Sequence, residues 1–201
     1  LKILNNIGMK NFTKTILASA FMLVMFSNLG WGQIIYSHDF GTTSITTKPY
    51  TETPTTLNSN LSNSSWTTSA TAFGGFNGSS GASLSLSNSS GTPTITLTFD
   101  VASGYSLSVT SFNFWRVRSN TGAQNWALTI NGISVGNGTI PTSGATIEQT
   151  NVSNTISGLT GTVIVIYTMS GASGSGTSRL DDFTLNGTVT AVASNIINTG
   201  Y

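Results

Sequence analysis

The stretch Thr94–Val101, TITLTFDV, decides the fold class of this chain. Its apolar side chains alternate with threonines and one aspartate, and alternate residues of a β-strand point to opposite faces. One face of such a strand is therefore apolar and the other polar, as expected where only one side of a sheet is covered. The stretch predicts a β-strand that contributes its apolar face to a core.

Other segments extend this pattern along the chain. Residues 126–135 read as a hairpin around Asn131-Gly132, the residue pair that best adopts the positive φ angles of a type I′ turn. Residues 162–169, TVIVIYTM, are continuously apolar and predict a strand covered on both faces. The remaining expected strands are residues 34–40, 83–87 and 179–185, with the first and last of these opening and closing the domain. No amphipathic helix follows residue 32, so short strands between polar turns predict an all-β antiparallel sandwich or barrel.

The first 32 residues are predicted to be a secretory signal peptide with upstream residues. Their apolar run, residues 16–26, is shorter than the roughly 20 residues that span a membrane and has the length of a signal's hydrophobic region. Lys10 and Lys14 precede it, and small residues up to Gly32 follow it; a buried N-terminal helix is the alternative. The predicted domains are 1–32 signal peptide, 33–189 β-sandwich and 190–201 C-terminal tail or linker.

The residues after position 32 carry little charge, with four basic and six acidic side chains. A net charge of −2 argues against nucleic acid as a partner, since phosphate binding needs a basic face. Cysteine is absent, so disulfides cannot stabilise the exported domain. Low charge combined with 38% hydrophobic residues predicts a folded chain rather than a disordered one.

The titratable residues do not form a recognisable catalytic set. His38 is the only histidine, and its neighbour Asp39 would need to be rebuilt around a distant serine to make a triad. Glycosidases need two carboxylates about 5 to 10 Å apart across a cleft, whereas Asp181 and Asp182 are adjacent on a predicted strand and point to opposite faces. We therefore predict that the chain is not an enzyme.

Two motifs resemble a family of secreted jelly-roll modules. Residues 112–122, FNFWRVRSNTG, are similar to a motif in which two aromatics lead into arginine, serine and a Thr-Gly turn, and residues 176–187, GTSRLDDFTLNG, are similar to the family's closing strand. The family occurs in exported Bacteroidota proteins, including type IX secretion cargo, and is carbohydrate-binding-module-like. This chain departs from it at Ser178, where the family commonly has Trp, and at Ala123, where it has Pro. The resemblance implies an antiparallel β-sandwich with jelly-roll, galactose-binding-like topology and an extracellular or cell-surface location.

The resemblance also implies that the first and last strands are neighbours, which a structural calcium ion can join. Calcium requires oxygen ligands, and Asp39 with Asp181 or Asp182 could supply them. The alternative is that Asp181, expected on the core side with Phe183, pairs with Arg179 or Arg118. No cofactor is predicted to be required, and a structural calcium ion is the one candidate.

Aromatic side chains are the candidate ligand contacts, because sugars stack on flat rings while polar groups bind their hydroxyls. If Phe112 and Phe114 are buried, alternation places Trp115 on the opposite, solvent-facing side of the strand. The alternative is that the tryptophans fill the core. The predicted ligand-binding residues are Trp66, Trp115, Trp126, Arg116 and Arg118, and Tyr50 and Tyr105 are further aromatic candidates.

The resulting functional hypothesis is a secreted, non-catalytic β-sandwich module that binds polysaccharide or cell-surface glycan. The alternative is a structural or adhesive extracellular subunit that binds protein or another copy of itself. Neither hypothesis involves nucleic acid, and neither requires a membrane span after removal of the signal.

Overall fold

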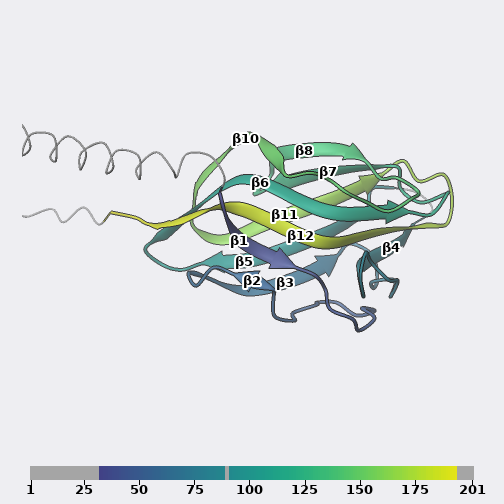
Figure 1. Cartoon of the computed structure of the whole chain (residues 1–201), viewed down its shortest axis with the longest axis horizontal. Helices are drawn as coiled ribbons and strands as arrows, with labels where there is room; N and C mark the ends of the chain where they lie inside the picture. The colour runs from purple at the N-terminus through teal and green to yellow at the C-terminus, as the bar shows by residue number, and fades with distance from the viewer. Residues whose placement is uncertain (1–31, 89–90, 194–201) are drawn as a thin grey trace, which may run out of the picture. The chain divides into compact units, whose positions relative to one another are not determined.

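β-Strands make up the regular structure of the residues that the computed structural model describes, 32–88 and 91–193 (Figure 1). Of the predicted signal segment, residues 1–32, all but Gly32 lie outside this part of the chain. No helix of the described residues is long and apolar enough to cross a membrane. The strands are β1 (Gln33–His38), β2 (Thr56–Leu57), β3 (Leu61–Thr68), β4 (Leu84–Asn88), β5 (Thr94–Val101), β6 (Tyr105–Arg118), β7 (Asn125–Ile130), β8 (Ile133–Thr139), β9 (Ala145–Thr146), β10 (Thr150–Leu159), β11 (Gly161–Ser170) and β12 (Gly176–Ala191).

The strands form two antiparallel sheets with jelly-roll connectivity. The first sheet has the order β10-β6-β12-β1-β2, with β4 added beside β12 and β9 beside β6, and the second has the order β3-β5-β11-β7-β8. Successive strands β5, β6 and β7 alternate between the sheets, and β8 pairs with β7 in the second sheet. β10, β11 and β12 alternate again: β10 and β12 pair with β6, and β11 lies between β5 and β7. Figure 1 shows β12 (yellow) between β6 and β1 in the first sheet, so the two ends of the domain lie on neighbouring strands. The predicted fold class is confirmed.

The core lies between the sheets and is rich in aromatic rings. The rings of Phe112 and Phe114 stack with centroids 6.1 Å apart, and Phe114 in turn stacks on Phe183 of β12 at 6.2 Å. Tyr36 of β1 stacks on Phe99 of β5 across the two sheets at 5.8 Å. Burial of such rings is the main stabilising contribution available to a domain without disulfides.

The strand at residues 94–101 and the hairpin are as predicted. β5 alternates half-buried and buried residues along its whole length. β7 and β8 are joined by Asn131 at φ 46° and Gly132 at φ 81°, the left-handed conformation of both central residues of a type I′ turn. Local sequence was sufficient for these elements because each depends on its own residues alone.

The prediction for residues 162–169 was wrong in one respect. Val163, Val165 and Tyr167 are buried, but Ile164 is 41% exposed, so β11 is covered on only one face. β11 is central in its sheet, between β5 and β7, and a two-layer sandwich leaves the outer face of each sheet to solvent. β-Branched residues fit a pleated strand on either of its faces. A continuous apolar run therefore predicts a strand but does not show that both of its faces are buried.

The last strand runs further than predicted. β12 continues to Ala191, two residues beyond the predicted domain end at Val189, and pairs there with Tyr105 of β6. The predicted tail therefore begins inside a strand. Residues 194–201 lie outside the described part of the chain.

Candidate functional site

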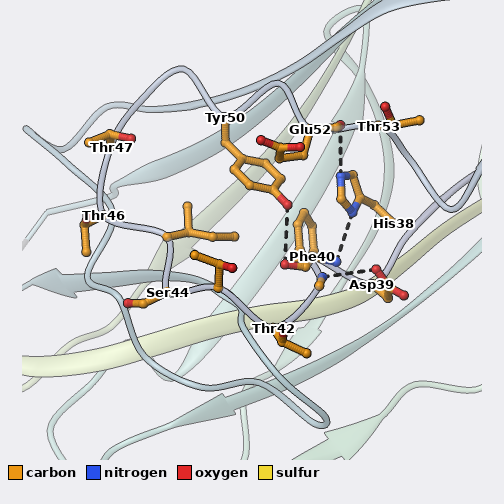
Figure 2. A pocket seen from close by; sticks show the side chains of 13 residues that line it. His38, Asp39, Phe40, Thr42, Ser44, Thr46, Thr47, Tyr50, Glu52 and Thr53 are labelled. Atoms are coloured by element: carbon orange, nitrogen blue, oxygen red, sulfur yellow. Dashed lines mark hydrogen bonds between the residues drawn. The ribbon is translucent and has the colours of Figure 1, made fainter.

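A hollow of about 510 Å³ opens beside the end of β1, within the loop that connects β1 to β2 (Figure 2). It begins at His38, the last residue of β1, and the rest of its lining comes from the connecting loop. The lining combines rings, hydroxyl groups and two carboxylates: His38, Asp39, Phe40, Gly41, Thr42, Thr43, Ser44, Ile45, Thr46, Thr47, Tyr50, Glu52 and Thr53. We call this hollow the β1–β2 pocket.

His38 is fixed in one neutral form by hydrogen bonds at both ring nitrogens. The backbone N–H of Phe40 donates to Nδ1 at 2.9 Å, so Nδ1 carries no proton. Nε2 lies 3.3 Å from the backbone carbonyl oxygen of Glu52, which can only accept, so Nε2 carries the proton. Burial lowers the pKa of His38 by penalising the charged imidazolium. His38 therefore holds the two ends of the loop together as a neutral donor and acceptor.

Rings form one wall of the pocket (Figure 2). The His38 ring stacks on Phe40 with centroids 4.6 Å apart and an interplanar angle of 11°, and Tyr50 lies tilted against both, 5.4 Å from His38. Phe40 adopts φ 57°, a left-handed conformation unusual for a bulky residue. The Tyr50 hydroxyl donates to the Phe40 carbonyl oxygen at 3.3 Å. Tyr50 is half-buried, so part of its ring borders the pocket.

A second, smaller hollow of about 200 Å³ adjoins the β1–β2 pocket. Asp39 and His38 line both, and the smaller hollow is completed by Ser37, Thr55, Asp182 and Thr184. Burial raises the pKa of Asp182, and the negative charge of Asp39 raises it further. Asp39, next to the end of the first strand, and Asp182 of the last strand therefore border the same small hollow, and a role for them as calcium ligands stays a prediction. Among the described residues, no group of three or more His, Cys, Asp or Glu side chains is arranged so that it could hold a metal ion.

Asp181 takes no part in this pair. Its Oδ2 accepts from the backbone N–H of Ser79 at 2.7 Å and its Oδ1 from that of Asp182 at 2.8 Å, and the side chain is fully buried. The expectation that Arg179 or Arg118 neutralises it is wrong: Arg179 donates to the Asn77 carbonyl, and Arg118 donates to the carbonyls of residues 119, 120 and 140.

A β-bulge explains why Asp181 was placed on the wrong face. Leu180 and Phe183 both face the core, and the pairing of β12 with β6 shifts between Asp181 and Thr184. The extra residue, Asp182, has φ 50°. Asp181 therefore follows core-facing Leu180 and points away from the core, beneath residues 78–80. A strict period of two cannot reveal such an insertion.

Two of the three predicted ligand-binding tryptophans lie in the core, which corrects the prediction for them. Trp66 is 2% exposed and its Nε1 donates to the Tyr36 hydroxyl at 2.8 Å. Trp126 is 5% exposed and packs edge-on against Phe114 at 5.0 Å. Neither ring presents a face to a ligand.

Trp115 lies on the outer face of the first sheet. Phe112 and Phe114 are fully buried, whereas Trp115, on the other side of the strand, is half-buried, in agreement with the alternation. Its pairing partner on the neighbouring strand β12 is Asp181. A Cβ on Gly144 would overlap the indole ring, so the backbone of Gly144 packs directly against it. Trp115 remains a candidate ligand contact outside the β1–β2 pocket.

Arg116 and Arg118 attach β6 to the segment that follows β8. Arg116 donates from Nε to the Thr139 carbonyl at 2.9 Å and from Nη1 to the Ala145 carbonyl at 3.1 Å. Arg118 Nε donates to the Ile140 carbonyl at 2.8 Å. These bonds give both arginines a structural role, and their contact with a ligand stays a prediction.

The β1–β2 loop is the part of the site that sequence reasoning missed. Its threonines and glutamate read as a polar connection, and only Tyr50 was singled out as an aromatic candidate. The available signal was the spacing of His38, Phe40 and Tyr50, three rings within a segment otherwise poor in apolar residues. Their convergence depends on the left-handed turn at Phe40, which local propensity does not predict.

Comparison with known proteins gives similarities to solved structures alone. No family model and no curated protein matches the chain. A CBM36 domain of a multidomain xylanase from the hindgut metagenome of Trinervitermes trinervoides is 19% identical, with a TM-score of 0.41, over 63% of this chain and 98% of that one. A carbohydrate-binding module CBM36 in complex with calcium and xylotriose is 17% identical, with a TM-score of 0.42, over 60% and 92%. The family 11 carbohydrate-binding module of Clostridium thermocellum, in complex with a mixed-linked tetrasaccharide, is 14% identical, with a TM-score of 0.38, over 73% and 97%.

Proposed function

We propose that this β-sandwich is an exported, non-catalytic module that binds glycan in the β1–β2 pocket. The observation that carries the proposal is the composition of the pocket: the ring of Tyr50 borders a hollow of about 510 Å³ whose remaining wall is dense in hydroxyl groups. A concave site with an aromatic surface and a few directed polar groups is the usual form of a small-ligand site. Export depends on the predicted signal, residues 1–32.

The chemistry of the lining suits a sugar. An aromatic ring offers a flat apolar surface to the C–H face of a pyranose, and a hydroxyl both donates and accepts hydrogen bonds, as sugar hydroxyls do. The pocket supplies six hydroxyl side chains between residues 42 and 53 besides the phenol of Tyr50. Carboxylates add strong acceptors for sugar hydroxyls.

The non-catalytic part of the proposal is supported by the engagement of His38. Both ring nitrogens already have partners within the loop, and the pKa of the ring is lowered by burial. A general base must be within hydrogen-bond reach of the proton that it removes, and His38 would have to give up a bond that closes the loop to be so. Asp181 is equally committed to backbone N–H groups.

Removal of the Tyr50 ring is expected to weaken glycan binding. Tyr50→Ala removes the stacking surface, whereas Tyr50→Phe keeps it and loses only the bond to the Phe40 carbonyl. Stacking of a nucleic-acid base on an aromatic side chain is worth on the order of 1–3 kcal/mol. With a similar magnitude for the C–H face of a sugar, Tyr50→Ala should weaken binding at least about fivefold and Tyr50→Phe much less. A glycan array on residues 33–201, followed by calorimetry on the best ligand, measures this.

Tyr105→Ala is the control for Tyr50→Ala. Tyr105 is also half-buried, but it begins β6 and pairs with Ala191, far along the sheet from the pocket, so its loss should leave binding intact. Full binding by Tyr50→Ala, together with loss in Trp115→Ala, would move the site to the outer sheet face. Shortened sugars after incubation would contradict the non-catalytic role. Self-association without binding to any glycan would favour the structural or adhesive alternative.

The same proposal includes a structural calcium ion held by Asp39 and Asp182, which we do not expect the fold to require. The two carboxylates border one small hollow, and its other side chains, apart from the engaged His38, end in hydroxyl groups. Oxygen ligands of this kind are those that calcium takes. Such an ion would neutralise two like charges that otherwise repel, and would join the end of β1 to β12.

Calcium is expected to raise the melting temperature of residues 33–201. An ion that binds only the folded state at 100 times its Kd stabilises that state by about 2.7 kcal/mol. Thermal unfolding in millimolar calcium and again in chelator measures the shift, and Asp182→Asn should remove it. A melting temperature indifferent to chelator eliminates the calcium site and leaves the glycan proposal standing.

A further inference from the structure

The β1–β2 pocket carries negative charge that no lining residue balances. Asp39 and Glu52 are exposed carboxylates on its wall, and the described residues that line it include no lysine or arginine. Lys48 is in the same loop but turns away, donating to the backbone carbonyls of Thr68 and Ala70. Asp182 adds a further carboxylate in the adjoining hollow. A ligand in this pocket meets negative potential from several directions.

The negative charges of Asp39 and Glu52 influence the pKa values of Tyr50 and His38. Burial raises the pKa of the Tyr50 phenol, and the negative charges of Glu52 and Asp39 raise it further. The same two carboxylates act on His38, although burial keeps its pKa low. His38 is therefore not the cation that neutralises them. Among the residues that the structure describes, none that lines the pocket supplies a positive charge.

The ring of Tyr50 and the carboxylates of Asp39 and Glu52 together favour a ligand that carries a positive charge. A cation is attracted both to carboxylates and to the face of an aromatic ring, and Tyr50 provides such a face beside Glu52 (Figure 2). The threonine hydroxyls of the same pocket match the hydroxyls of a sugar ring. A ligand that satisfies every wall carries both sugar hydroxyls and a positive charge.

We propose that the β1–β2 pocket selects glycans bearing a protonated amino group, such as glucosamine oligomers, over neutral glycans. This inference rests on the proposed glycan-binding function and adds the charge of its ligand. The ammonium group lies between Glu52, Asp39 and the ring of Tyr50, and the sugar hydroxyls bond the threonines. An N-acetyl group on the same nitrogen removes the charge and with it the selectivity.

Three β-1,4-linked tetramers test this, because they differ only in the group at C2: glucose with hydroxyl, N-acetylglucosamine with acetamide and glucosamine with ammonium. Calorimetry is done with chelator present, so that no metal ion occupies Asp39, at about pH 6, below the ordinary pKa of such an amine. An exposed ion pair contributes up to about fivefold in affinity, so the glucosamine tetramer should bind about fivefold more tightly for each carboxylate engaged. Its advantage should fall with added salt, which screens exposed charges.

Glu52→Gln tests the charge most directly. The hydrogen bond between Glu52 and His38 uses the backbone carbonyl of Glu52 and not its carboxylate, so the substitution should leave that bond intact. The variant should lose about fivefold in affinity for the glucosamine tetramer and almost nothing for the two neutral ones. Glu148→Gln is the matched control: Glu148 is also exposed but does not line the pocket, so the same change in net charge should leave all three affinities unaltered.

The outcomes separate this inference from the function on which it rests. Equal affinities for the three tetramers, all weakened in Tyr50→Ala, would overturn the amino-sugar preference and retain glycan binding. No binding of any tetramer would overturn the amino-sugar preference, and no binding to any glycan on the array would overturn glycan binding as well. Equal loss of glucosamine binding in Glu52→Gln and Glu148→Gln would reduce the effect to net charge and overturn the site. A tetralysine peptide that competes as well as the glucosamine tetramer would remove the sugar from the recognition.

Discussion

Trp66→Ala is expected to lower the free energy of unfolding by roughly 3–5 kcal/mol, the usual cost of removing a large ring from a packed core. Trp66 packs edge-on against Phe40 at 5.3 Å and against Phe183 at 5.3 Å, so it connects the second sheet to the first and to the pocket. Its Nε1 bond to Tyr36 is lost as well. Domains of this size are stable by only about 5–15 kcal/mol, so the variant should be close to unfolding.

Trp115→Ala is the control within the same residue type. Trp115 is only half-buried, on the outer sheet face, so its loss should cost about 1 kcal/mol, near the centre of the distribution for single substitutions. Urea unfolding of both variants followed by fluorescence measures the two values. A change below about 1 kcal/mol for Trp66→Ala would contradict its place in the core.

Asp181 is expected to make the protein less stable as the pH rises from about 4 to about 6. Burial raises the pKa of Asp181 from 3.8 to about 6 in the folded state. Between these values the folded protein keeps a proton that the unfolded chain has released, so raising the pH favours unfolding. The contribution is complete below pH 3.8, is lost as the pH passes 6, and amounts to on the order of 1–2 kcal/mol.

Asp181→Asn isolates this effect because an amide does not titrate. The variant also loses one backbone hydrogen bond, either with Ser79 or with Asp182, but that loss does not depend on pH. The difference in unfolding free energy between wild type and variant should therefore change between pH 4 and 6 and be constant above. Asp100→Asn is the opposite control: hydrogen bonds from Asn63 and Thr162 lower the pKa of Asp100, so its contribution is lost as the pH falls. A pH-independent difference for Asp181→Asn would refute the assignment.

Strands were predictable from sequence because their signal is local. The alternation of apolar and polar residues in TITLTFDV predicts a strand, and the Asn131-Gly132 pair predicts a type I′ turn. Both predictions need only the residues of the segment itself. Pairing of the first strand with the last came from the resemblance, and the register of His38 opposite Phe183 confirms it.

The faces of individual residues were harder to predict. Alternation shows that two residues share a side, but not whether a second sheet or solvent covers that side, as Trp66 and Ile164 both show. One inserted residue at Asp182 reversed the face of Asp181. The pocket could not be predicted from the sequence either. It depends on a left-handed turn at Phe40 and on hydrogen bonds between His38 and residues 40 and 52, which local sequence patterns do not predict.

The pairing of β1 with β12 has a consequence for how the domain can be tethered. Gln33 lies beside Gly187 at one end of the pair and His38 beside Phe183 at the other, so chain entry and chain exit are separated from the pocket by about 17 Å of strand. Gln33 and the end of β12 at Ala191 therefore both lie at the end of the strand pair that is away from the pocket. A fusion partner, surface anchor or immobilising tag at either terminus should thus leave the mouth of the pocket free for a polymer to enter.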